Sequence, residues 1–257
     1  MLVLFGLSVL FSCSSQSKLS NGGTTLRLHP EQGKAYTITT KTNMMNTMEV
    51  QGQTMNMSQN LETRQSFTAQ SVSNDQSVFE TQIEAIKMTI SQMGMKLEYD
   101  SEHPEKTSPM LAGQTQEIEK KLNKPETITY DALGNTLDSI GPNTEELGSV
   151  IVLPEKGLSV GSTWDFNKTQ KISGTEINSK MTYTVTAISK KSVDVSINGT
   201  VEGSNEVSGT YTGTASINPQ TGLIIQDNTK FNISMTINEQ GMSIPVTIVG
   251  SSTVEVK

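Results

Sequence analysis

Along most of this chain, polar and apolar residues alternate one by one. The stretch "AYTITTKT" (35–42) puts Tyr36 and Ile38 on one side and threonines on the other. The stretch "MGMKLEY" repeats the pattern on one face with Met93, Met95, Leu97 and Tyr99. A period of two residues is typical of a strand with one buried face. Because the turn signals between these stretches, such as Gly52, are short, we predict long strands joined into an antiparallel meander.

One segment has a helical period instead. In "SPMLAGQTQEIEKKLNKP" (108–125) the apolar residues that recur at helical spacing are Leu111, Ile118 and Leu122. Ser108 suits the N-cap and Pro109 suits the first helical position. Lysines crowd the end of the segment, where cations complement the helix dipole, and Pro125 ends it. We therefore predict one main helix that interrupts the meander.

After this helix the alternation returns. The stretch "TITYDALGNTLDSI" predicts a hairpin that turns at Gly134 and Asn135, and "GPNTEELGSV" (141–150) predicts one short helical turn. Strand-like alternation then continues from Val150 to the C-terminus, with a turn at "NPQTG" (218–222).

The two halves of the chain resemble each other. "GKAYTI" (33–38) parallels "GSTWDF" (161–166), and "SFTAQSVSNDQSVFE" (66–80) parallels "TYTVTAISKKSVDVS" (182–196). Either the chain contains a duplication, or two threonine-rich meanders look alike by composition. We divide residues 26–257, a single β-rich domain, into related halves at about 26–148 and 149–257.

The composition supports a mainly β fold. Hydrophobic residues make up 33% of the chain and aromatic residues 5%, which suits sheets with one solvated face better than a bundle of buried helices. The prediction is a large curved antiparallel sheet in two related halves with one main helix. The net charge of −7, without a basic cluster, argues against a nucleic-acid partner.

The single cysteine lies behind an apolar run. Met1 to Phe11 is too short to span a bilayer but has the length of a signal-peptide apolar region. Leu10 to Cys13 then resembles the bacterial lipobox, in which a signal peptidase cuts before a cysteine that carries diacylglycerol. This predicts a signal peptide at 1–12, a lipid on Cys13 and a flexible tether at 13–25. The alternative is a plain cysteine in a cleaved or buried segment.

Several short motifs resemble those of uncharacterised Bacteroidota lipoproteins, which begin with a lipobox. The shared motifs are Gly33 to Tyr36, Tyr99 to Ser101, and Leu153-Pro154 with Val160 to Trp164. That family has no established activity, and its expected architecture resembles the lipoprotein-carrier (LolA-type) fold. The resemblance implies an incomplete barrel whose open side is closed by helix, with an apolar cavity. It also implies a lipid-anchored protein of the cell envelope, which we place on the periplasmic face of the outer membrane.

No catalytic motif is present. The sequence has neither a G-x-S-x-G elbow nor a phosphate-binding loop, and His29 and His103 lack the paired spacing of a zinc site. Asp100, Glu102 and Glu105 cluster after a predicted strand, which we interpret as a solvated loop. We therefore expect no enzyme activity, no cofactor and no metal site built from these groups.

Methionines are the unusual feature of the sequence. Eight of the 13 lie in one third of the chain: Met44, Met45, Met48, Met55, Met57, Met88, Met93 and Met95. Three interpretations are open: core filling, a polarizable lining for varied apolar ligands, or thioether ligands for Cu(I). The residues assigned to a concave ligand-binding face are Met55, Met57, Met88, Met93, Met95 and Leu97.

These observations give a main functional hypothesis and two alternatives. The main hypothesis is a non-enzymatic envelope lipoprotein that binds a lipid or acyl chain on its methionine-rich concave face. The first alternative is an accessory lipoprotein that docks to an outer-membrane partner through exposed sheet edges. The second is a methionine-rich protein that binds Cu(I).

Overall fold

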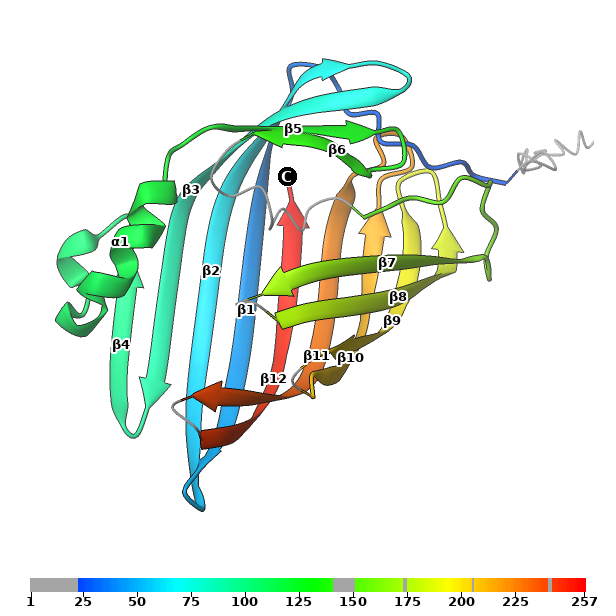
Figure 1. The fold of residues 1–257 in the computed structure, drawn as a ribbon. Coiled ribbons are helices and arrows are strands. Elements are labelled where there is room, and N and C mark those ends of the chain that lie inside the picture. The colour runs from blue at the N-terminus through cyan, green and yellow to red at the C-terminus, as the bar shows by residue number, and fades with distance from the viewer. Residues whose placement is uncertain (1–22, 141–150, 173–174, 205, 240–241) are drawn as a thin grey trace, which may run out of the picture.

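The computed structural model is one large antiparallel sheet that curves without closing (Figure 1). It describes residues 23–140, 151–172, 175–204, 206–239 and 242–257. Eleven strands follow one another in the order β6-β5-β3-β2-β1-β12-β11-β10-β9-β8-β7, and β4 pairs with β3 beside β5. Within the described ranges, no helix is both long and apolar enough to cross a membrane.

Most of the chain lies in long strands. In the first half they are β1 (Ala35–Val50), β2 (Gln53–Val72), β3 (Gln76–Gln92), β4 (Met95–Asp100), β5 (Glu126–Asp131) and β6 (Thr136–Ile140). In the second half they are β7 (Thr163–Ile172), β8 (Thr175–Ile188), β9 (Val193–Gly203), β10 (Ser208–Ile217), β11 (Ile224–Glu239) and β12 (Met242–Val256). The predicted fold class, a mainly β curved sheet that stays an incomplete barrel, is confirmed.

The alternation of the sequence becomes two chemically different faces of the sheet. Tyr36 and Ile38 are buried on the face that we call the inner face, because β7 and β8 curve round in front of β1 and β12 and share a core with them (Figure 1). The opposite, outer face carries mainly threonine, serine, asparagine and charged residues. The register places Thr210, Thr212 and Thr214 of β10 there, opposite Asn232, Lys230 and Asn228.

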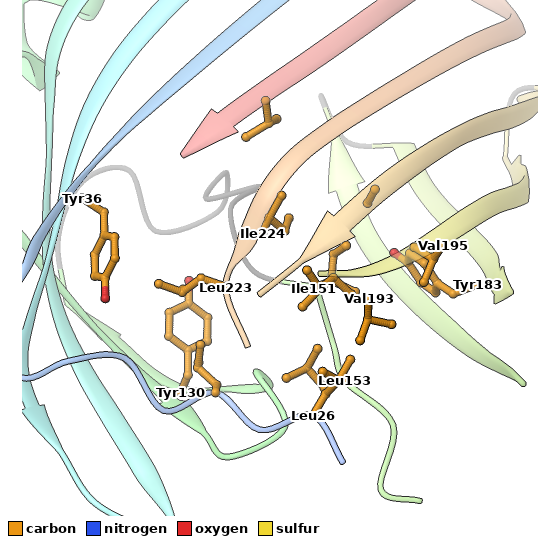
Figure 2. Close-up of a cluster of buried hydrophobic side chains, with 14 of the residues drawn as sticks. Leu26, Tyr36, Tyr130, Ile151, Leu153, Tyr183, Val193, Val195, Leu223 and Ile224 are labelled. Atoms are coloured by element: carbon orange, nitrogen blue, oxygen red, sulfur yellow. The ribbon is translucent and has the colours of Figure 1, made fainter. Parts of the chain in front are cut away.

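A hydrophobic core fills the inner face at one end of the sheet, which we call the closed end. Leu26 and Leu153 come from two non-strand segments and lie beside each other among side chains of both curved walls (Figure 2). The two segments are held by backbone hydrogen bonds, from Leu28 to Ala132 and from Leu153 to Leu133. Phe67 and Phe79 stack in this core, with ring centroids 3.9 Å apart. The chain therefore closes this end with its own connections.

The predicted helix is present, but it starts later than its sequence signals suggest. Pro109–Leu111 forms a 3-10 turn, and α1 runs over Ala112–Lys121. The Ser108 hydroxyl does not cap the helix, because it accepts a hydrogen bond from the Glu98 amide at 2.9 Å and so extends the edge of β4. Asn123 adopts a positive φ of 57° just after the helix and donates its amide to Ile83. The predicted stop at the end of this segment is therefore correct.

The turns follow their sequence signals. Gln51 and Gly52 both have positive φ in the β1–β2 hairpin, as has Gly222 in the turn at 218–222. Gly134 also has positive φ in the β5–β6 turn, where the Asp131 carboxylate accepts hydrogen bonds from two backbone amides. The helical turn predicted at 141–150 lies outside the described residues, as do Cys13 and the whole signal segment.

The sequence likeness of the two halves has a counterpart in hydrogen bonding. Gly33, with a φ of 78°, donates its amide to Ala69, and Gly161, with a φ of 87°, donates its amide to Val185. Both hydrogen bonds lie just before a shift in strand register, between Ala69 and Ser71 in one half and between Val185 and Ala187 in the other. A glycine with positive φ, hydrogen-bonded just before a register shift, therefore starts the meander in each half.

The paired aromatic residues of the two halves also occupy equivalent positions. Tyr36 lies opposite Phe67 on β1 and β2, and Trp164 lies opposite Tyr183 on β7 and β8. Trp164 stacks on Tyr183 with centroids 5.0 Å apart and donates its indole N–H to the Val152 carbonyl at 2.9 Å. The parallel motifs thus mark the same structural step in each half.

A cluster of charged residues ties β2, β3 and the end of β4 together on the outer face. The Arg64 guanidinium lies 2.7 Å from the carboxylate of Glu102 and 3.3 Å from that of Glu84. The Lys87 ammonium lies 3.0 Å from Glu102 and 3.5 Å from Asp100. Of the acidic residues that we interpreted as a solvated loop, Asp100 and Glu102 therefore have cationic partners. Hydrogen bonds from Arg64 and Lys87 lower the pKa of Glu102 from its ordinary 4.5 to about 2.

This cluster predicts a pH-dependent contribution to stability. Because the pKa of Glu102 is lower in the folded chain, its contribution is present above pH 4.5 and is lost as the pH falls through about 2. We expect Glu102→Gln to lower the urea midpoint at pH 6, with the difference from the parent shrinking toward pH 2. Glu80→Gln, at an exposed position of β3, is the control. A constant difference across this pH range would contradict the prediction.

Candidate functional site

The inner face continues beyond the closed-end core as a half-exposed apolar surface, which we call the open half. The cross-strand register places fourteen apolar side chains on it: Met44, Met48, Met55, Met57, Ile90, Met95, Leu97, Phe166, Met181, Tyr211, Phe231, Ile233, Met235 and Ile248. Most are half-buried rather than buried, so water reaches them. In folded proteins, contiguous apolar surfaces that remain in contact with water often mark sites where another molecule binds.

Three glycines lie in the middle of the open half, and neighbouring side chains fill the space beside them. Gly199, Gly209 and Gly250 occupy inner-face positions on β9, β10 and β12. A Cβ atom on Gly250 would lie 2.5 Å from the Phe231 ring, because that ring lies flat across the glycine. Met181 and Ile233 lie in the same way across Gly199 and Gly209. Interior glycines in strands often mark sites of close approach, and here the groups that approach are neighbouring apolar side chains.

Most of the predicted ligand-binding residues lie on this inner face. Met55 is directly opposite Met48, and Met57 is opposite Asn46. Leu97 is opposite Ile90, and Met95 is opposite Gln92 on the neighbouring strand. Residues far apart in sequence therefore form one continuous surface. Whether this surface binds a ligand stays a prediction at this point.

Met93 does not share that surface, which corrects its sequence assignment. With Gly94 it forms the two-residue turn between β3 and β4, where both residues have positive φ. Its side chain is 79% exposed and lines a shallow hollow with Met45 and Ser58 of the outer face. The period-two argument fails here because the strand ends at Gln92, one residue before Met93.

Met88 lies on the inner face but is covered by the helix. Together with Ile86, Tyr99 and Leu111 it forms a second buried core, against which Ile118 of α1 and Leu122, just after the helix, pack. Figure 1 shows α1 beside β3 and β4, at the edge of the sheet. Met88 therefore fills a core, as one of our interpretations held, whereas Met55 and Met57 stay accessible.

A polar group borders the open half toward the closed end, and sequence reasoning missed it. The Asp227 carboxylate of β11 accepts a hydrogen bond from the Thr229 hydroxyl at 2.8 Å, and the hydroxyls of Thr42 and Ser252 lie 3.2 Å apart. Burial raises the pKa of the Asp227 carboxyl, although its hydrogen bond from Thr229 opposes this. The alternation of β11 does place Asp227 on the inner face, and that was the available signal.

Three amide side chains interrupt the apolar surface: Asn46, Gln59 and Gln92. Asn46 of β1 faces inward between Met57 and Ile248. Its Oδ1 is buried and has no hydrogen-bond partner in the part of the chain that the structure describes. An unsatisfied buried oxygen is uncommon in folded proteins.

The described residues do not bring together a metal centre of the usual kind. No group of three or more His, Cys, Asp or Glu side chains among them is arranged to hold an ion. His29 lies in a surface hollow at the closed end, with Glu31 and Thr221, and His103 contacts Glu105 at 3.5 Å in an exposed loop. The chemistry available on the inner face is thus apolar contact with a few hydrogen-bonding groups.

Comparisons with known proteins give a family match and a fold likeness. Residues 147–224 match DUF6263, a family of unknown function. A lipovitellin structure described by its lipid–protein interactions is similar over 88% of this chain, with a TM-score of 0.52 and 11% sequence identity. This chain spans 25% of that lipovitellin chain.

Two weaker structural similarities involve bacterial proteins. The translocator domain of the autotransporter NalP from Neisseria meningitidis matches with a TM-score of 0.35, 9% identity and coverage of 87% of this chain and 89% of that chain. An outer membrane channel from Pseudomonas putida F1 matches with a TM-score of 0.27, 8% identity and coverage of 90% and 98%. No curated protein matches this sequence. The likeness to lipovitellin is a likeness of fold.

The close packing at Gly250 predicts the effect of adding a side chain at this position. In Gly250→Val the new side chain would meet both the Phe231 ring and the Asn43 carbonyl oxygen at about 2.5 Å. We expect a loss of about 1–3 kcal/mol in the free energy of unfolding, measured by urea denaturation, because the backbone and Phe231 must shift. The neighbouring outer-face change Ser251→Val is the control. Equal stability of the two variants would show that Phe231 and the Asn43 carbonyl are not tightly packed against Gly250.

Proposed function

We propose that this protein is a non-enzymatic carrier or sensor that binds an apolar ligand, a lipid or acyl chain, on the open half of its inner face. One observation supports this most directly: a curved sheet presents a mainly apolar surface inward and a polar surface outward. Burying the open half against a hydrocarbon chain would gain roughly 25 cal/mol for each Å² removed from water. Methionines suit such a surface because their side chains adapt to different apolar shapes.

The fold likeness is compatible with this proposal. The lipovitellin structure whose fold resembles this chain is described by its lipid–protein interactions. The lipobox-like sequence at Cys13 supports a second part of the proposal: a lipid anchor holds the protein at the cell envelope, on the periplasmic face of the outer membrane. A ligand of lipid class would be available at that place.

A second candidate function is docking of a protein partner on the same surface. The observation that favours it is that the open half is an open surface and not an enclosed cavity. The hollow at His29 lies at the closed end, and the hollow at Met93 lies toward the outer face, so neither belongs to the open half. Binding of Cu(I) is a third use of the same residues, because Met48 and Met55 are directly opposite across two strands. Both alternatives are outcomes of the experiment below.

Matched methionine variants test the ligand-binding face. We expect Met55→Asp/Met57→Asp to bind the fluorescent apolar probe phenylnaphthylamine at least about tenfold more weakly, because each lost methionine contact is worth about 1.5–3 kcal/mol and tenfold corresponds to 1.4 kcal/mol. Met45→Asp makes the same change on the outer face, opposite Ser58, and should leave binding unchanged. Circular dichroism of each variant checks that the sheet persists.

Native mass spectrometry of the protein purified from a bacterial envelope without detergent completes this test. A discrete added mass in the lipid range, lost in the inner-face variant, is the expected result. A bare mass in the parent, together with unchanged probe binding in the folded double variant, would overturn the proposal. Retention of added Cu(I) instead of lipid would favour the metal alternative, and a bare protein that co-purifies with a protein would favour docking.

The anchor predicts a separate effect on location. We expect Cys13→Ala to abolish incorporation of labelled fatty acid and to shift the protein from the membrane fraction to the soluble fraction, because two or three acyl chains anchor far more firmly than polar contacts. Ser14→Ala is the control and should behave as the parent. Continued labelling of the Cys13→Ala protein would show that the lipid is not on this residue.

A further inference from the structure

The polar group at the border of the open half contains the one charged side chain that β1, β2, β10, β11 and β12 direct inward, among the side chains that the structure describes. This is Asp227, which lies opposite Val254 on one side and Ala215 on the other. On the same strand Thr229 donates a hydrogen bond to it, and Ser252 and Thr42 follow across β12 and β1. All four polar residues are half-buried, so they remain accessible from the interior.

This polar group has the position that the head of an amphipathic molecule would take. Toward the closed end it meets the filled core, in which Val254 is 7% exposed and Ala215 3%. Toward the open half it is followed directly by Met44 and Phe231, two residues further along their strands. From Thr42 to Met48 the strand extends about 20 Å at roughly 3.3 Å per residue. One acyl chain in half a bilayer extends about 15 Å, so it fits along this path.

The charge of Asp227 selects among possible heads. A carboxylate accepts hydrogen bonds and attracts a cation, and it repels a second carboxylate or a phosphate. Burial raises the pKa of the nearby Tyr183 hydroxyl to about 12. The hydroxyl therefore stays protonated and adds no second negative charge beside Asp227. The side chains of Thr42 and Ser252 hydrogen-bond either donors or acceptors. The arrangement thus favours a head with N–H or O–H donors, and a protonated amine most of all.

We infer that the ligand of the open half is a single-chain amphiphile whose amine or hydroxyl head binds at Asp227, Thr229, Ser252 and Thr42 while its hydrocarbon chain runs along Met44, Met48 and Met57. This inference rests on the proposed function, because it names the class of ligand for the same surface. A free fatty acid of equal chain length is the ligand that the carboxylate selects against. The head lies at the covered end of the path and the chain points to the open rim.

Three amphiphiles of equal chain length test the inference on the full chain. Tetradecylamine, tetradecanol and myristate compete against phenylnaphthylamine at pH 8, where the amine is charged. We expect the amine to bind at least about fivefold more tightly than myristate, with the alcohol between them. In Asp227→Asn the amine and myristate should differ by less than about twofold. Asp165→Asn is the matched control, because Asp165 accepts a hydrogen bond from Thr182 at 2.6 Å on the outer face.

The outcomes separate this inference from the proposal beneath it. If no amphiphile displaces the probe and the inner-face methionine variant binds it as well as the parent does, the proposed function itself fails. If all three amphiphiles bind equally, or if Asp227→Asn leaves their order unchanged while still folded, the assignment of the head fails and the apolar site remains. A similar change of order in Asp165→Asn would assign the effect to net charge and would also overturn the inference.

Discussion

The structure depends on one constraint: a sheet whose strands alternate between mainly polar and mainly apolar positions must cover its apolar face. Curvature does this at the closed end, where β1, β2, β8 and β9 approach one another around the segments that carry Leu26 and Leu153. The helix α1 does it at one edge, over Met88 and Tyr99. Elsewhere none of the described helices or strands packs over the inner face. The open half is the part of that face that the described elements leave uncovered.

The covered and uncovered parts differ in side-chain size and packing. The closed end is filled by stacked aromatic rings and branched aliphatic residues, which gain both from burial and from close contact. The open half combines methionines with glycines, such as Gly250 beneath Phe231. A surface of flexible methionine side chains beside glycines is poorly suited to a rigid core. It is well suited to apolar molecules of different shapes, because the methionine side chains adapt to each of them.

The outer face consists mainly of side chains that interact favourably with water. Threonine rows and ion pairs such as Arg64 with Glu102 cover it. Exposed ion pairs contribute little individually, but this cluster joins β2, β3 and the end of β4 on the side opposite the helix. Both faces of this edge are thus fixed, by α1 inside and by charges outside. The lining formed by Leu97 and Ile90 is held in place at the border of the open half.

The sequence by itself determined the local features of this protein. Strand period, turn glycines such as Gly52 and Gly134, and the presence of one helix follow from interactions within a few residues, so they could be predicted. The same holds for the face of Met55, Met57, Met95 and Leu97, because the period of two extends along each strand. The likeness of the halves was also visible, through the glycine and aromatic spacing.

Only the tertiary structure decided which part of the inner face is covered. Met88 and Met57 both occupy inner-face positions of alternating strands, yet α1 buries Met88 and leaves Met57 accessible. Met93 fails because the end of β3 is set by its pairing with β4. Asp227 becomes significant only when β1, β11 and β12 align it with Thr42 and Ser252. These features depend on register and curvature between strands that are distant in sequence, such as β1 and β12, where Thr42 and Ser252 are 210 positions apart. Alternation along one strand carries no information about either.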